Sequence, residues 1–166
     1  MKGWRWAIAT LGVMGLGLAG MWLGLVGLGH WLPNRHTITL RRTYPQPIDR
    51  LWDHIATTNR GEGPPMMQVA TVPRQWQTIT PAGSIVTVIE QQVMPPHLYH
   101  AQWRYGRWGY QSDRIYRLHA RPNGTTEVTV TETSQIETPW VNGLMALTGR
   151  QTAIKQEMKR LDAITP

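Results

Sequence analysis

The stretch TPWVNGLMALTGRQTAIKQEMKRLDA, residues 138–163, decides how the rest of the chain folds. Its apolar residues recur at spacings of three and four, with an interruption at Gln151: Trp140, Leu144, Leu147, Ile154, Met158 and Leu161. This spacing predicts one long amphipathic helix with a buried face. Thr138 is suited to cap that helix and Pro139 to begin it. A helix of this kind needs a surface to pack on, which the preceding residues must supply.

The residues before this helix have the composition of β-strands. Runs rich in β-branched and aromatic residues are separated by turns of Pro, Gly and Asn, and Pro122-Asn123-Gly124 is a strong hairpin signal. The predicted strands span residues 36–43, 66–72, 75–80, 84–94, 97–105, 108–120 and 125–135. Short turns between them predict an antiparallel meander. We therefore expect an α+β fold in which a curved antiparallel sheet of six to seven strands wraps around the long C-terminal helix.

Two further features lie between the first and second predicted strands. Ile48, Leu51, Trp52 and Ile55 recur at i, i+3, i+4 and i+7, which predicts a short amphipathic helix. Residues 57–65 then contain Gly and Pro in the pattern of a loop, which is a candidate entrance to a cavity.

The N-terminal region is apolar. Between Trp6 and Leu32 there is no Asp, Glu, Lys or Arg, and a helix over this run would be about 40 Å long, enough to cross a bilayer. We therefore predict a single-pass transmembrane helix in a cell membrane, with the side of the soluble domain undetermined because basic residues flank both ends. The alternative is a signal peptide cleaved ahead of His30. Gly20 and Gly24 form a G-x-x-x-G pair, which would allow a homodimer through this helix.

Size and composition fit one folded domain. The chain has 166 residues, no Cys and a formal net charge of +7. Without Cys, the chain has no disulfides, no thiolate catalysis and no cysteine-ligated zinc. We predict that residues 1–35 form a tail, the transmembrane helix and a short tether, and that residues 36–166 form the domain.

Three motifs, taken in order, carry a family resemblance. YPQPIDRLW at residues 44–52 places a proline-marked turn before a helix with a Trp. VIE at 88–90, followed by MPPHL at 94–98, is a strand ending in a double proline. GTTEVTVTE at 124–132, followed by Thr138 and Pro139, is a last strand leading to a proline-opened helix. Together they resemble the helix-grip fold of the SRPBCC or START-like superfamily, particularly its polyketide cyclase/dehydrase and lipid-transport group, over residues 36–161.

The resemblance implies an apolar cavity between the sheet and the final helix. Members of the superfamily bind lipids, polyketides or other hydrophobic small molecules, and some catalyse cyclisation or dehydration. We therefore favour a membrane-anchored domain that binds a hydrophobic small molecule or lipid without a cofactor. Two alternatives stay open: an enzyme of the cyclase/dehydratase type with Glu90 or Glu132 as acid or base, and a non-catalytic membrane interaction module.

Seven aromatic, apolar or small residues are predicted to line the cavity. They come from two neighbouring strands and the final helix: Trp103, Tyr105, Tyr110, Tyr116, Leu144, Met145 and Thr148. This choice depends on strand register, because a shift of one residue moves every side chain to the opposite face.

Other polar residues carry weaker signals. His97 and His100 lie three apart on a predicted strand and so face opposite sides, and we predict no metal site. Arginines on the neighbouring strands and near the N-terminal helix are candidates for contact with anionic lipid headgroups: Arg41, Arg42, Arg104, Arg107, Arg114, Arg117 and Arg121. The meander offers no recognition helix, so we expect no nucleic-acid partner.

Overall fold

Seven antiparallel strands form one sheet in the order β1-β7-β6-β5-β4-β3-β2. The computed structural model describes residues 2–60, 66–69, 74–79, 83–106 and 109–163, and only the backbone of residues 2–13, 60, 66–69 and 153. The strands are β1 (Arg35–Tyr44), β2 (Met66–Val69), β3 (Gln75–Ile79), β4 (Ile85–Met94), β5 (Leu98–Tyr105), β6 (Tyr110–Ala120) and β7 (Thr126–Ile136). Where the structure describes them, these strands agree with the predicted ones to within two residues.

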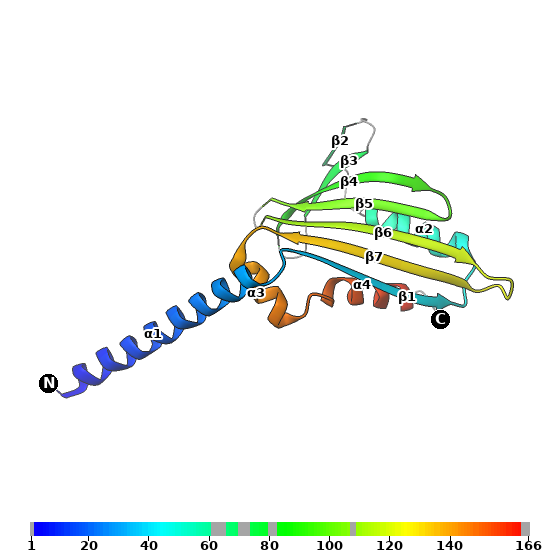
Figure 1. Cartoon of the computed structure of the whole chain (residues 1–166). Coiled ribbons are helices and arrows are strands. Elements are labelled where there is room, and N and C mark those ends of the chain that lie inside the picture. The colour runs from blue at the N-terminus through cyan, green and yellow to red at the C-terminus, as the bar shows by residue number, and fades with distance from the viewer. Residues whose placement is uncertain (1, 61–65, 70–73, 80–82, 107–108, 164–166) are drawn as a thin grey trace.

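Four helices accompany the sheet: α1 (Lys2–Trp31), α2 (Ile48–Arg60), α3 (Pro139–Thr148) and α4 (Thr152–Asp162). Helices α2 and α4 lie on one face of the curved sheet, and α1 projects away from the end of the sheet where α3 lies (Figure 1). Helix α2 continues to Arg60, so residues 57–60 are helical rather than part of the predicted loop. Residues 61–65 of that loop lie outside the described part of the chain.

The main core lies between one face of the sheet and helices α2 and α4. Side chains alternate along the strands, so Tyr99 and Tyr116 point into the core from β5 and β6 and are fully buried. Leu51 of α2 and Leu161 of α4 are also fully buried and belong to the same cluster. The apolar stripe predicted for each of these helices therefore has a sheet to cover it.

The prediction of one continuous helix over residues 138–163 is wrong. Helix α3 ends at Thr148, because Gly149 adopts a φ of 94°, a conformation that glycine tolerates and an α-helix excludes. Only the second half contributes side chains to the main core. Ile154 of α4 is buried, whereas Leu144 and Leu147 of α3 are 41% and 68% exposed. The apolar side chains of α3 therefore serve a surface other than the main core.

Helix α3 packs closely against the C-terminal end of α1. Gly143 lies at the crossing, where a Cβ atom would collide with the carbonyl oxygen of Leu25. The side chain of Asn142 is buried there, and its Nδ2 donates a hydrogen bond to the carbonyl oxygen of Gly29 at 3.0 Å. Thus α1 is fixed to α3 by packing and hydrogen bonds in addition to the three-residue connection to β1.

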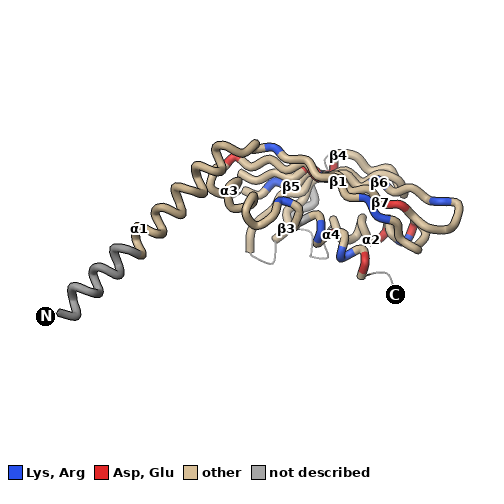
Figure 2. The backbone as a smooth tube through the Cα atoms, turned by 60° about the horizontal axis from the view of Figure 1, so that its bottom comes forward, with Lys and Arg blue, Asp and Glu red and all other residues tan. Residues whose placement is uncertain are grey.

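Before this crossing, α1 exposes apolar side chains. Leu16 and Leu23 are 77% and 69% exposed, and no charged residue interrupts the part of α1 that Figure 2 colours. Nevertheless, among the residues that the structure describes, no helix is long and apolar enough to cross a membrane. The predicted helix is present, but the structure gives no support for its crossing a bilayer.

Two arginines of β1, Arg41 and Arg42, lie far from α1. Arg41 and Arg42 pair in register with residues near the start of β7, at the opposite end of β1 from the α1 connection. Both make ion pairs, Arg41 with Glu127 and Arg42 with Asp162. Our expectation that these two residues lie close to the N-terminal helix is therefore wrong, because an extended strand carries them about 20 Å away.

Candidate functional site

A cavity of about 370 Å³ lies at the end of the sheet where β5 ends and β6 begins. We call it the α3 cavity. It is lined from the strands by Tyr105, Tyr110 and Arg114, and from the helix by Trp140, Val141, Leu144 and Met145. Apart from Arg114 the lining is aromatic or aliphatic, and the volume falls in the range of small-molecule sites.

The strands and α3 place these residues by their ordinary periodicities. Tyr105 and Tyr110 pair directly across β5 and β6, and their ring centres are 4.9 Å apart. Val141, Leu144 and Met145 lie three and four residues apart on α3, so they share one side of that helix. The side of α3 that the main core leaves uncovered thus forms one wall of the cavity.

Arg114 is the charged residue of the lining, and the protein holds it on three sides. Its Nη2 donates to Glu132 Oε2 at 3.1 Å, and its Nη1 donates to the hydroxyl of Tyr116 at 3.4 Å. The guanidinium carbon lies 4.8 Å from the ring centre of Trp103, a cation–π distance. The side chain is only 13% exposed.

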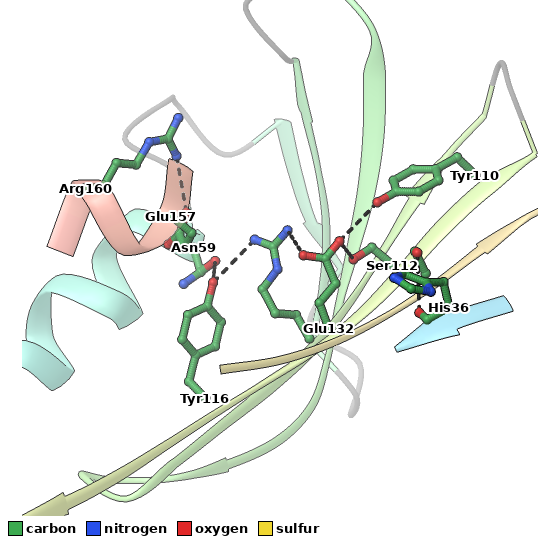
Figure 3. A network of polar contacts seen from close by, with 10 residues as sticks. His36, Asn59, Tyr110, Ser112, Tyr116, Glu132, Glu157 and Arg160 are labelled. Carbon is green, nitrogen blue, oxygen red and sulfur yellow. Dashed lines mark hydrogen bonds and ion pairs between the residues drawn. The ribbon is translucent and has the colours of Figure 1, made fainter. Parts of the chain in front are cut away.

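Glu132 fixes this arrangement from the neighbouring strand. Arg114 and Glu132 pair in register across β6 and β7. The second carboxylate oxygen of Glu132 accepts hydrogen bonds from Ser112 Oγ at 2.9 Å and from the hydroxyl of Tyr110 at 3.1 Å. Figure 3 shows Tyr110 and Ser112 converging on Glu132, with Tyr116 on the far side of the network. The carboxylate thus orients both an arginine and a tyrosine of the cavity wall.

Burial and neighbouring groups together set the protonation of the cavity groups. It raises the pKa of Tyr110, and the nearby Glu132 raises it further. Burial likewise raises the pKa of Tyr105. For Arg114, burial alone would lower the pKa, but its neighbours Tyr116 and Glu132 outweigh burial and raise it. At neutral pH the cavity therefore presents two protonated phenols and one cation.

The structure places the seven predicted ligand-binding residues in three settings. The α3 cavity is lined by four of them, namely Tyr105, Tyr110, Leu144 and Met145. Trp103 is buried against the Arg114 guanidinium, and Tyr116 belongs to the main core. Thr148 is exposed, and its hydroxyl donates to the carbonyl oxygen of Leu144. Whether any of them binds a ligand stays a prediction.

Sequence reasoning did not assign Arg114, Trp140 and Val141 to the cavity. Arg114 was grouped with arginines expected at a lipid surface, although it shares the parity of Tyr110 and Tyr116 along the same strand. Because side chains alternate along a strand, residues separated by an even number lie on the same face, and this rule alone would have placed Arg114 on the face of the two tyrosines. Trp140 was assigned to the sheet-facing side of a continuous helix, whereas its ring packs 5.3 Å from that of Trp22 in α1.

The remaining acids and histidines lie elsewhere. Glu90 is buried on β4, and neither it nor Glu132 is among the residues that line the cavity. His100 contacts Asp113 at 2.8 Å. Within the described ranges, no group of three or more His, Asp or Glu residues could hold a metal ion. A second hollow of about 570 Å³, between the end of α1 and β7, has an exposed glutamate, Glu137, in its lining.

Neither the family models nor the curated proteins give a match to the sequence. Solved structures do. Mll3558 from Rhizobium loti matches with a TM-score of 0.54 and 21% identity, over 78% of this chain and 96% of that one. MLL2253 from Mesorhizobium loti matches with a TM-score of 0.55 and 14% identity, over 77% and 98% of the two chains. DynU16, from the dynemicin biosynthetic locus, matches with a TM-score of 0.53 and 15% identity, over 78% of this chain.

Solved structures that the chain matches are of the helix-grip type. The fold is a helix-grip fold. The chain spans about half, 48%, of DynU16 and nearly all of Mll3558. In this helix-grip fold the C-terminal segment is divided, so that α4 closes the main core and α3 covers the cavity.

Proposed function

We propose that the protein binds a hydrophobic small molecule or lipid in the α3 cavity. This proposal rests on one observation: an aromatic and aliphatic cavity of about 370 Å³ whose wall includes Arg114, an arginine fixed by its hydrogen bond to Glu132. A ligand there would gain roughly 25 cal/mol for each Å² of apolar surface removed from water. The protonated phenols and the guanidinium would orient its polar group.

Filling the cavity tests this proposal. Leu144→Trp adds bulk to a lining residue, whereas Leu147→Trp adds the same bulk to a more exposed residue of α3 that is not part of the lining. The unaltered chain and Leu147→Trp should bind the aromatic ketone 2-acetonaphthone with one-to-one stoichiometry in isothermal titration calorimetry. Leu144→Trp should lose this binding. Equal binding by all three proteins would place the ligand outside the α3 cavity and refute the proposal.

We further propose that α1 attaches this binding domain to a lipid bilayer. Support comes from the uncharged sequence between Trp6 and Leu32 and from the exposed apolar side chains of α1, such as Leu16 and Leu23. Leaving many such side chains in water is unfavourable, so a membrane or a partner should cover them. A homodimer through Gly20 and Gly24 stays a prediction; a Cβ atom at either glycine would have no neighbour within 4 Å.

Flotation with phosphatidylcholine vesicles tests the attachment. The full chain should float with the vesicles. Leu16→Glu combined with Leu23→Glu should abolish flotation, because each acidic residue at the centre of a membrane helix costs about 3 kcal/mol. Ile85→Glu with Met94→Glu, at two exposed positions of β4, should float like the unaltered chain. A chain that stays soluble as a dimer would show that a second copy covers α1.

A further inference from the structure

The charges around the α3 cavity balance one another. Arg114 faces the cavity and forms an ion pair with Glu132 at 3.1 Å, and both side chains are largely buried. The positive charge that a ligand would meet is thus already neutralised at close range by a residue of the protein.

A second pair continues the balance on the side of α4. Glu157 is buried, lies near enough to interact electrostatically with Arg114, and forms an ion pair with Arg160 at 3.6 Å. Figure 3 shows Glu157 and Arg160 at the α4 end of the network that contains Glu132. The two arginines and two glutamates of these two ion pairs therefore carry no net charge together.

Arg114 nevertheless retains hydrogen-bonding capacity. A guanidinium has five N–H donors. Among the described residues, Glu132 and Tyr116 each accept one hydrogen bond from Arg114, and its Nε is buried without a partner. Because Arg114 lines the cavity, its unused Nη hydrogens are the donors available to a ligand oxygen there.

These facts favour a ligand with oxygen but without charge. A carboxylate would enter a largely apolar space whose cation is already paired, so its desolvation would go uncompensated. A carbonyl oxygen loses less hydration free energy on leaving water, and it can still accept a hydrogen bond from Arg114. We propose that the α3 cavity selects a neutral, oxygen-bearing apolar molecule, such as an aromatic ketone, over a carboxylate of the same shape, and that Glu132 imposes this choice. The inference rests on the proposed function of the cavity.

Three probes with one ring system test the inference on the full chain by isothermal titration calorimetry at neutral pH. They are 2-acetonaphthone, with a neutral carbonyl; 2-naphthoate, with a carboxylate; and 2-ethylnaphthalene, with no oxygen. The ketone should bind about fivefold more tightly than the hydrocarbon, because it gains a hydrogen bond from Arg114. It should bind about tenfold more tightly than the carboxylate.

Glu132→Gln supplies the sharper comparison. Glutamine keeps the size of the side chain and an oxygen that can accept from Ser112 and Tyr110, but it removes the charge that balances Arg114. Affinity for 2-naphthoate should rise about a hundredfold, so that the carboxylate overtakes the ketone. Glu127→Gln is the matched control, because Glu127 lies on the same strand and pairs with Arg41 and Arg121 at the other end of the sheet. It should leave the order of the three probes unchanged.

The outcomes separate the inference from the function on which it rests. If none of the probes binds the unaltered chain, the proposed function fails. If 2-naphthoate binds the unaltered chain best, or if folded Glu132→Gln keeps the original order, the inference is overturned while the binding function stands. Should Glu132→Gln fail to fold by circular dichroism, the order for the unaltered chain decides the question alone.

Discussion

At the scale of single residues, the pairing of Arg114 and Glu132 links stability to the site. Both side chains are largely buried, and burying two charges is costly. Hydrogen bonds from Ser112 and Tyr110 to Glu132, together with the ring of Trp103 over Arg114, offset part of that cost. The pair therefore stabilises the fold only while both members are present.

Removing one member should reveal this dependence. Arg114→Met should lower the free energy of unfolding by about 3–5 kcal/mol, because it leaves the Glu132 carboxylate buried without a cation. Chemical denaturation followed by circular dichroism measures the change. The double variant Arg114→Met with Glu132→Met should lose less free energy of unfolding than the single variant Arg114→Met. A single variant as stable as the unaltered chain would show that Glu132 is not held as a buried anion.

The tyrosines should make the fold sensitive to alkali. Burial, with a further effect of Asp162, raises the pKa of Tyr44 from 10.0 to about 12, and burial also raises the pKa values of Tyr105, Tyr110 and Tyr116. A raised pKa in the folded state means that the stabilisation is complete below pH 10 and is lost as the pH rises toward about 12.

Ultraviolet absorbance of phenolate measures this effect. Between pH 10 and about 12 the folded chain should show less phenolate than the same chain in denaturant, and Tyr44→Phe should reduce the difference. Identical titration curves for the two states would contradict the burial of these hydroxyls.

At the scale of elements, the strands could be predicted far better than the helices. Alternating side chains and the turns of Pro, Gly and Asn placed Tyr105 and Tyr110 on one face of neighbouring strands, as the structure has them. The end of α3 at Gly149 could not be predicted from the residue pattern. A glycine within an apolar repeat is as compatible with a weak position inside a helix as with a helix end. Arg114 was missed for a related reason. The alternation of side chains along β6 predicts the face of the sheet on which Arg114 lies, but an arginine is by residue type expected to be exposed to solvent.

The crossing of α1 and α3 provides a prediction at this scale. Gly143→Ala should force the helices apart, because the added methyl group would collide with the backbone of Leu25. The expected loss is about 1–3 kcal/mol, together with faster hydrogen exchange in α3. Gly20→Ala is the matched control: with no neighbour within 4 Å, it should leave the stability unchanged or raise it by about 0.5–1 kcal/mol. Equal behaviour of the two variants would mean that α1 does not pack on α3.

At the scale of the whole molecule, helix α3 both lines the cavity and packs against α1. One side of it forms a wall of the cavity through Leu144 and Met145, and another meets α1 at Gly143. Trp140 contributes to both, since it lines the cavity and its ring lies against that of Trp22. The sequence motifs predicted a sheet closed by a C-terminal helix. They did not predict that half of this segment would join the cavity to α1, because that depends on a long-range contact with residues more than a hundred positions away.

Methyl NMR of methionine tests whether the α3 cavity is the binding site. The full chain is labelled at its methionine methyl groups, Met145 is assigned with Met145→Leu, and 2-acetonaphthone is added. We expect the Met145 methyl resonance to shift under the ring current of the bound naphthalene, while that of Met158, a residue of α4 buried in the main core, does not. An unchanged Met145 resonance together with shifts at Met14 or Met21, which are exposed on α1, would contradict it and place the ligand on the N-terminal helix.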